Sequence, residues 1–169
     1  SYHYPYVNES YAYSGTKSMY MYKSGSSYHA YFCLPAFEDS TSELFMTMMV
    51  RSSYSTSTYG FQVGVMTDPT DINTFTLVDH IYTTTANQWM EFEVDFSDYT
   101  GPSGYITLMC PTSISYGYHY VDDITVMRQP TCWRPNNFVA SNITHDSLTL
   151  SWTPDIRNIS NNGYYIEYD

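Results

Sequence analysis

The chain has 169 residues, a formal net charge of −11 and 20 tyrosines, but only 6 lysines and arginines in total. Such an acidic chain would repel a phosphate backbone and matches anionic membrane surfaces poorly, so we expect no nucleic-acid partner. No apolar run approaches the ~20 residues needed to span a bilayer, so we expect no membrane insertion. Because 43% of the residues are hydrophobic and 18% are aromatic, we expect a folded chain with a core.

Apolar and polar residues alternate along most of the chain, a pattern that predicts strands, and no segment has a convincing helical period. Tyr2, Tyr4 and Tyr6 alternate at the N-terminus and predict a first or edge strand. Further strands are expected over residues 17–22, 28–34, 44–50, 61–65, 75–82, 91–96, 105–110 and 116–126. Gly-, Pro- and Ser-rich turns separate them, and many short strands of this kind predict a two-sheet sandwich.

A linker is expected over residues 129–134, which have prolines at both ends. It separates a predicted jelly roll over residues 1–128 from a second domain over 135–169. In that domain Leu150 and Trp152 lie on an alternating strand and residues 164–168 begin another. Two or three strands cannot bury both faces of a sandwich. Since the chain also begins at Ser1 instead of methionine, we expect a piece of a modular protein.

The sequence contains no motif typical of catalysis. A Gly-x-Ser-x-Gly elbow, a His-Glu-x-x-His motif and a phosphate-binding loop are all absent. The cysteines form no Cys-x-x-Cys pair. Cys33 and Cys110 lie in strand-like runs and are expected to be buried thiols, whereas Cys132 in the linker could pair outside this chain. We therefore expect no enzymatic activity.

The stretch Gly64–Phe75 resembles the jelly-roll modules called choice-of-anchor J. These modules are related to MAM and cleaved-adhesin domains and occur in secreted proteins of Bacteroidetes-type bacteria. Further matches are Asn8, Ser14, Gly15, Ser18, Trp89 and the stretches 92–101 and 120–126. Residues 135–169 resemble the first strands of a fibronectin type III domain, with Trp152 as its core tryptophan. The resemblance implies an all-β chain, a jelly-roll β-sandwich followed by an incomplete immunoglobulin-like sandwich, on a secreted or cell-surface protein.

A structural calcium ion is expected at the strand over residues 116–126. Its even-numbered residues share one face, so Asp122 should point into the core with Ile124 and Val126, while Asp123 points away. An unpaired inward carboxylate is costly, and Ca²⁺, which takes oxygen ligands, would stabilise it. The resemblance implies partners in the N-terminal segment: Glu9, the side chain of Asn8, and carbonyls from Ser14 to Lys17. Alternatively, Asp122 caps backbone amides and binds no metal.

The tyrosines are the candidate ligand-binding residues. A tyrosine ring can stack on a sugar ring or anchor a protein interface, and the tyrosines in loops are the better candidates. These are Tyr54, Tyr59, Tyr99 and Tyr116, with Tyr118 on the neighbouring strand. One hypothesis is a monomeric, non-catalytic adhesion module that binds a glycan or an extracellular protein. The other is a passive spacer that accompanies a peptidase or glycosidase domain elsewhere in the parent protein.

Overall fold

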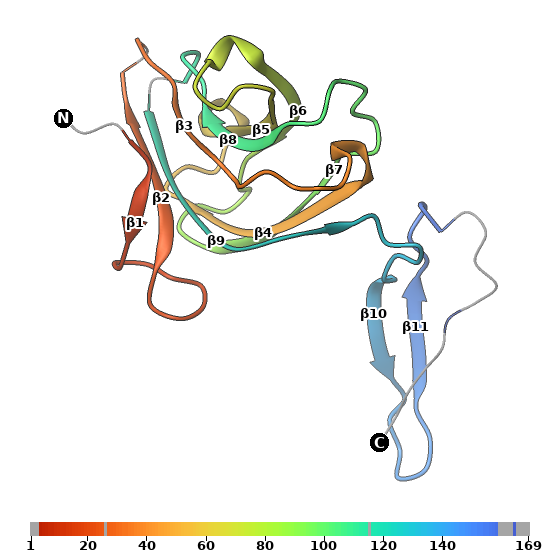
Figure 1. Ribbon diagram of the computed structural model, residues 1–169. Helices are drawn as coiled ribbons and strands as arrows, with labels where there is room; N and C mark the ends of the chain where they lie inside the picture. Colours follow the sequence, from red (N-terminus) through yellow and green to blue (C-terminus); the bar gives the residue numbers. More distant parts are fainter. Residues whose placement is uncertain (1–3, 26, 115, 159–163, 165–169) are drawn as a thin grey trace. The chain divides into compact units, whose positions relative to one another are not determined.

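The computed structural model describes residues 4–25, 27–114, 116–158 and 164. The chain divides into two compact units, Ser1–Gln129 and Pro130–Asp169 (Figure 1). Every strand pair is antiparallel, and the only helical segments among the described residues are three 3-10 turns. They are η1 (Thr41–Glu43), η2 (Ser57–Tyr59) and η3 (Ile72–Thr74). The predicted all-β fold is confirmed.

The first unit consists of two antiparallel sheets stacked as layers (Figure 1). The five-stranded sheet has the order β1 (Tyr6–Asn8), β2 (Ser18–Ser24), β9 (Tyr116–Arg128), β4 (Leu44–Ser52), β7 (Trp89–Asp95). The four-stranded sheet has the order β3 (Ala30–Cys33), β8 (Tyr105–Cys110), β5 (Phe61–Met66), β6 (Phe75–Ile81). Apart from the consecutive pairs β1–β2 and β5–β6, neighbours in each sheet come from distant parts of the sequence, as in a jelly roll.

The core lies between the two sheets. Met46, Met48 and Val50 of β4 are buried on the inner face of the five-stranded sheet. Val63 and Leu108, also fully buried, pack in the same cluster from the opposite sheet. Each side chain buried in this way contributes on the order of 1.5–3 kcal/mol of hydrophobic stabilisation. The alternation in β4 therefore arises from one buried face, whereas β5 and β8 are buried along almost their whole length.

A β-bulge in β9 reverses the direction of Asp122. His119 and Val121 point into the core, but the register between β9 and β4 then shifts, and Asp123 has a φ of 46°. The extra residue changes the alternation, so that Ile124, beyond the bulge, packs against the core again. Asp122 lies opposite Met49, on the outer face. The prediction that Asp122 points inward was wrong, because strict alternation does not hold across a bulge.

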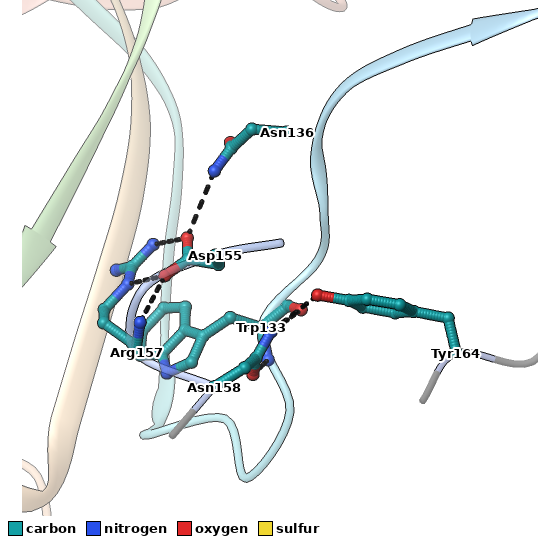
Figure 2. Close-up of polar contacts among 6 residues, drawn as sticks. All are labelled: Trp133, Asn136, Asp155, Arg157, Asn158 and Tyr164. Carbon is teal, nitrogen blue, oxygen red and sulfur yellow. Dashed lines mark hydrogen bonds and ion pairs between the residues drawn. The ribbon is translucent and has the colours of Figure 1, made fainter. Parts of the chain in front are cut away.

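The second unit contains the antiparallel pair β10 (Asn136–Ser141) and β11 (Thr149–Thr153). Figure 2 shows the polar contacts beside it. The Arg157 guanidinium lies 3.5 Å from the centre of the Trp133 ring and pairs with Asp155 at 2.7 Å. Asn158 exchanges two hydrogen bonds with the backbone of Trp133, at 2.7 and 2.8 Å. Trp133, from the expected linker, is thus buried within the second unit.

Two further predictions for the second unit are not tested. The strand expected over residues 164–168 lies, apart from Tyr164, outside the described residues. The fibronectin-type assignment and the limits of the three predicted segments stay predictions. Among the described residues, no helix is long and apolar enough to cross a membrane.

The three cysteines are free thiols in different environments. Cys110 is buried, Cys33 is half-buried and accepts a hydrogen bond from the Thr107 hydroxyl at 3.2 Å, and Cys132 is exposed. Cys110 is therefore the buried strand thiol that the sequence predicts, while Cys33 is partly accessible.

A candidate binding surface of tyrosines

A row of large side chains crosses the outer face of the five-stranded sheet. In the strand register Tyr6 faces Tyr20, Tyr20 faces Tyr120, Tyr120 faces Arg51, and Arg51 faces Trp89. Each of the five strands contributes one residue. Met21, Val121 and Val50, which neighbour Tyr20, Tyr120 and Arg51, are in the core, so these three side chains point outward. Tyr6 and Trp89 are paired with them in register and so lie on the same outer face. We call these five residues the aromatic row.

The rings at one end of the aromatic row contact one another directly. The centroids of Tyr20 and Tyr120 are 4.5 Å apart with an interplanar angle of 23°, a stacked pair. Tyr6 packs edge-on against Tyr20 at 5.3 Å and is 47% exposed. Aromatic pairs of this kind contribute about 0.5–1.5 kcal/mol beyond the area that they bury. These contacts hold the rings of Tyr6, Tyr20 and Tyr120 against one another, and Tyr6 remains accessible to solvent.

Three of the five tyrosines predicted from the sequence extend this surface. Tyr118 lies 5.2 Å from Tyr22, which stacks on Tyr20 at 6.1 Å. Tyr54, from the loop after β4, is 5.8 Å from Tyr118 and stacks on Tyr59 at 4.3 Å. The structure thus brings Tyr54, Tyr59 and Tyr118 together and joins them to the aromatic row through Tyr22.

The other two predicted tyrosines have different positions. Tyr116 faces Ser24 across β2 and β9, at the end of the same outer face, and is 48% exposed. Tyr99 is only 8% exposed, belongs to the core, and donates a hydrogen bond to the Pro102 carbonyl at 2.8 Å. The prediction of Tyr99 as a binding residue is corrected, because the loop folds its ring inward. We define the tyrosine surface as the aromatic row with Tyr22, Tyr54, Tyr59, Tyr116 and Tyr118.

The hydroxyls of Tyr20, Tyr118 and Tyr120 remain neutral over a wide pH range. Burial, followed by neighbouring tyrosines, raises the pKa of Tyr20 and of Tyr118 above the usual value near 10. Burial also raises the pKa of Tyr120. A neutral phenol both donates and accepts hydrogen bonds. These rings therefore combine flat apolar faces with hydroxyls that can bind polar ligand groups of either kind.

The loop between β1 and β2, residues 9–17, covers the other half of the aromatic row. Tyr11 lies edge-on against Tyr120 at 5.0 Å, and the Arg51 guanidinium lies 4.3 Å from the centre of the Tyr11 ring. Tyr13 packs against Trp89 at 5.9 Å. Because Tyr11 and Tyr13 are 46% and 52% exposed, they form the solvent-facing aromatic surface at this end.

Asp122 and Asp123 hold this loop. The Asp122 Oδ2 accepts hydrogen bonds from the backbone N–H groups of Tyr13 and Ser14, at 2.7 and 3.3 Å. The Ser14 hydroxyl donates to Asp123 Oδ1 at 2.5 Å. Both carboxylates therefore contact the same loop, although the sequence predicts that they point in opposite directions. The bulge at Asp123 is the reason.

The residues proposed as calcium ligands do not fit the ion in this arrangement. Asn8 accepts a hydrogen bond from the Ser10 N–H at 2.7 Å, and the Glu9 carboxylate pairs with the Lys17 ammonium at 3.2 Å. N–H donors point at Asp122, whereas Ca²⁺ needs six to eight oxygens around one point. Within the described ranges no three His, Cys, Asp or Glu side chains form a group that could hold a metal. The calcium site stays a prediction.

An acidic pocket of about 320 Å³ adjoins the loop on the same face. Tyr13, Met49, Glu91 and Asp123 are among its lining residues. Carboxylates accept hydrogen bonds and donate none. The pocket is therefore suited to hydroxyl or amino groups of a ligand and disfavours a ligand that carries negative charge.

Sequence reasoning missed several residues of the tyrosine surface and of the loop that covers part of it. These are Tyr6, Tyr11, Tyr13, Tyr20, Tyr22, Arg51, Trp89 and Tyr120. The alternation of tyrosines at 20 and 22 and at 116, 118 and 120 places each group on one strand face. That these faces adjoin follows from strand pairing across about a hundred residues, which no local pattern reveals.

Comparisons with known proteins show the fold class. No family model and no curated protein matches the chain. The K1 cleaved adhesin domain of Lys-gingipain from Porphyromonas gingivalis W83 is similar in structure, with 14% identity over 76% of this chain and 85% of that chain and a TM-score of 0.56. A family 30 carbohydrate-binding module has 12% identity over 83% and 79% of the two chains and a TM-score of 0.54. The K2 cleaved adhesin domain of Lys-gingipain has 13% identity over 72% and 78%, with a TM-score of 0.51.

At such low identity these similarities bear on fold alone. The chain has the jelly-roll β-sandwich fold that is found in adhesin domains and carbohydrate-binding modules. Any inference about a ligand must therefore come from the residues of the tyrosine surface.

Proposed function

We propose that the chain is a non-catalytic glycan-binding module of a secreted or cell-surface protein and that the tyrosine surface is its binding site. The aromatic row is the observation that carries this proposal. Strands in a sheet lie about 4.7–4.9 Å apart, so five strands place aromatic and guanidinium groups at regular steps over about 19 Å. Together with Tyr11 and Tyr13, which lie over its Tyr120–Trp89 end, such a row is suited to an extended chain of sugar rings.

The chemistry of the surface favours a neutral glycan. Sugar rings have apolar C–H faces that can lie on tyrosine rings, and hydroxyls that can pair with neutral phenols. Glu91 and Asp123 line the adjoining pocket, and the chain carries a formal charge of −11. Arg51, the one basic residue of the aromatic row, already lies against Tyr11. Uronate and sulfate groups would therefore be repelled.

Binding of the purified chain to an array of neutral and acidic glycans and matrix proteins tests this proposal. A neutral hit is then titrated by calorimetry against Tyr20→Ala and Tyr118→Ala. Each variant should bind about tenfold more weakly, since a stacked ring contributes roughly 1 kcal/mol or more. Tyr82→Ala is the matched control, because Tyr82 is 42% exposed and follows β6 of the other sheet. Its affinity should not change.

Two results would contradict the proposal. The first is no binding to any glycan or protein, which would support a passive spacer that keeps another domain clear of the cell surface. The second is a ligand whose affinity is the same in Tyr20→Ala, Tyr118→Ala and wild type. Binding to a matrix protein that these variants abolish would keep the site and replace the glycan with a protein.

A further inference from the structure

We propose that Asp122 and Asp123 are positioning residues. They fasten the β1–β2 loop onto the aromatic row by direct hydrogen bonds, without a metal ion, so that Tyr11 and Tyr13 complete the binding surface. The statement about ligand binding rests on the proposed function. The statements that the two aspartates position the loop and that they do so without a metal do not rest on it, and they can be tested without any ligand.

The loop reaches the sheet through its aromatic residues and its turn. Tyr11 contacts Tyr120 and Arg51, while Tyr13 contacts Trp89, so the loop spans the middle and one end of the aromatic row. Gly15 turns the chain back towards β2 with a φ of 60°, and no atom lies within 4 Å of where its Cβ would be. The loop is therefore held at the Tyr11–Ser14 side and is open at Gly15.

The bulge makes two adjacent carboxylates available to one loop. Neighbouring residues of a regular strand point to opposite faces. With Asp123 at a φ of 46°, however, Asp122 meets the backbone of Tyr13 and Ser14 while Asp123 meets the Ser14 hydroxyl. The bulge thus brings both carboxylates to the same loop. The irregularity of β9 therefore helps to position the binding surface.

The hydrogen-bond pattern argues for direct attachment. Besides the two loop amides at Oδ2, Asp122 accepts the Asp123 N–H at Oδ1, at 2.8 Å. Hydrogen bonds to a charged acceptor are about twice as strong as neutral ones. The positive ends of three N–H groups thus point at the carboxylate where a calcium ion would need oxygens. The amides supply the stabilisation that a cation would otherwise provide.

Amide hydrogen exchange measured by NMR tests the attachment. In the wild-type chain the Tyr13 and Ser14 amides should be protected, and EDTA or added CaCl₂ should leave their exchange unchanged. Asp122→Ala should accelerate both by about tenfold or more, since a hydrogen bond to a charged acceptor contributes about 1.5–3 kcal/mol. Amides of β5 and β8 should keep their protection, which shows that the sandwich is intact.

Two further variants distinguish a local loss of hydrogen bonds in the loop from a general folding defect. Ser14→Ala removes only the hydroxyl bond to Asp123 and should accelerate the Ser14 amide by a smaller factor than Asp122→Ala. Glu38→Gln removes one exposed negative charge away from the loop and should change neither amide. Acceleration by EDTA alone would overturn the proposal in favour of a metal, and unchanged exchange in Asp122→Ala would overturn it outright.

The effect on binding is measured with the same chains. If the array gives a glycan ligand, Asp122→Ala should weaken its binding by a factor similar to that of Tyr11→Ala combined with Tyr13→Ala. Full affinity in Asp122→Ala would exclude the loop from the binding surface and so contradict this inference while the proposed function stands. If no ligand is found, the proposed function fails, but the exchange experiment still decides whether Asp122 fastens the loop.

Discussion

At the scale of single residues, tyrosine has three kinds of environment in the first unit. Tyr99 is a core residue, Tyr20 is half-buried in the aromatic row, and Tyr11 is 46% exposed on a loop. A tyrosine ring is a large apolar group with one polar end, so each position is stable provided that the hydroxyl finds a partner or water. Composition alone therefore does not identify the binding residues.

Tyr99→Phe separates the core role from binding. The change removes the hydrogen bond to the Pro102 carbonyl and should lower the free energy of unfolding by about 1 kcal/mol in urea denaturation. Glycan affinity should be unaffected, since the ring faces the core. Tyr82→Phe, which alters an exposed tyrosine, serves as the stability control. If Tyr99→Phe lost glycan affinity without losing stability, Tyr99 would belong to the binding site after all.

The core also contains ionisable side chains that make the first unit sensitive to acid. His119 is 1% exposed and packs against Phe61, and neither of its ring nitrogens has a hydrogen-bond partner among the described residues. Burial lowers the pKa of His119 to about 4 and lowers that of His29 as well. Lys23 is fully buried, donates to the Pro111 carbonyl, and has a pKa lowered by the same cause.

We expect the first unit to lose stability as the pH falls from about 6.5 to about 4. The folded state favours neutral His119, so the unfolded chain binds the proton more readily and acid favours unfolding. The lowering from 6.5 to about 4 corresponds to about 3 kcal/mol when complete. Urea denaturation at several pH values measures it, and His119→Leu should flatten the acid side of the profile. His145→Gln, an exposed change in the second unit, should not.

At the scale of secondary structure, the bulge in β9 is the element that decides how the site is built. It lets His119 and Val121 point inward before it and Ile124 after it, with both acidic residues left at the β1–β2 loop. The positive φ of Asp123 is tolerated because Asp and Asn adopt the left-handed region more readily than other side chains. β-branched residues are rarely found there.

Asp123→Val should therefore destabilise the first unit by about 2 kcal/mol, as judged by urea denaturation. Asp123→Asn, which tolerates the same backbone conformation, should cost less than half of that. Both variants lose the charge, so the difference between them reports backbone strain together with the Ser14 hydrogen bond, which an Asn oxygen can still accept. Equal losses would show that the bonded charge, and not the φ angle, matters at this position.

At the scale of the whole molecule, the first unit should be self-sufficient. Its core and every residue of the tyrosine surface lie within Ser1–Gln129. A chain that ends at Gln129 should keep the acid profile, the protection of the Tyr13 amide and any glycan affinity of the longer chain. Trp89 would then be the only tryptophan of the three, so its fluorescence would report on the aromatic row. Loss of cooperative unfolding in the shorter chain would contradict this.

Much of the fold follows from local patterns. The predicted strands at 44–50, 61–65 and 105–110 are confirmed as β4, β5 and β8. Alternation in β4 reflects burial on one face, whereas β5 and β8 are apolar runs buried along almost their whole length. Residues 41–43, just before the predicted strand at 44–50, form a 3-10 turn, and β4 begins at Leu44. The candidate site is less predictable. Tyr54, Tyr59 and Tyr118 can be chosen from the sequence as loop and strand tyrosines, but Tyr99 is chosen by the same reasoning and is buried.

The sequence by itself determined that this chain is an acidic, tyrosine-rich, all-β protein, since composition and alternation are local properties. The tertiary structure alone decided that Tyr6, Tyr20 and Tyr120 meet in one row, because strand pairing brings residues a hundred positions apart to neighbouring strands. It also decided that Asp122 points outward to a loop, because one extra residue in β9 reverses the alternation on which the sequence argument depends.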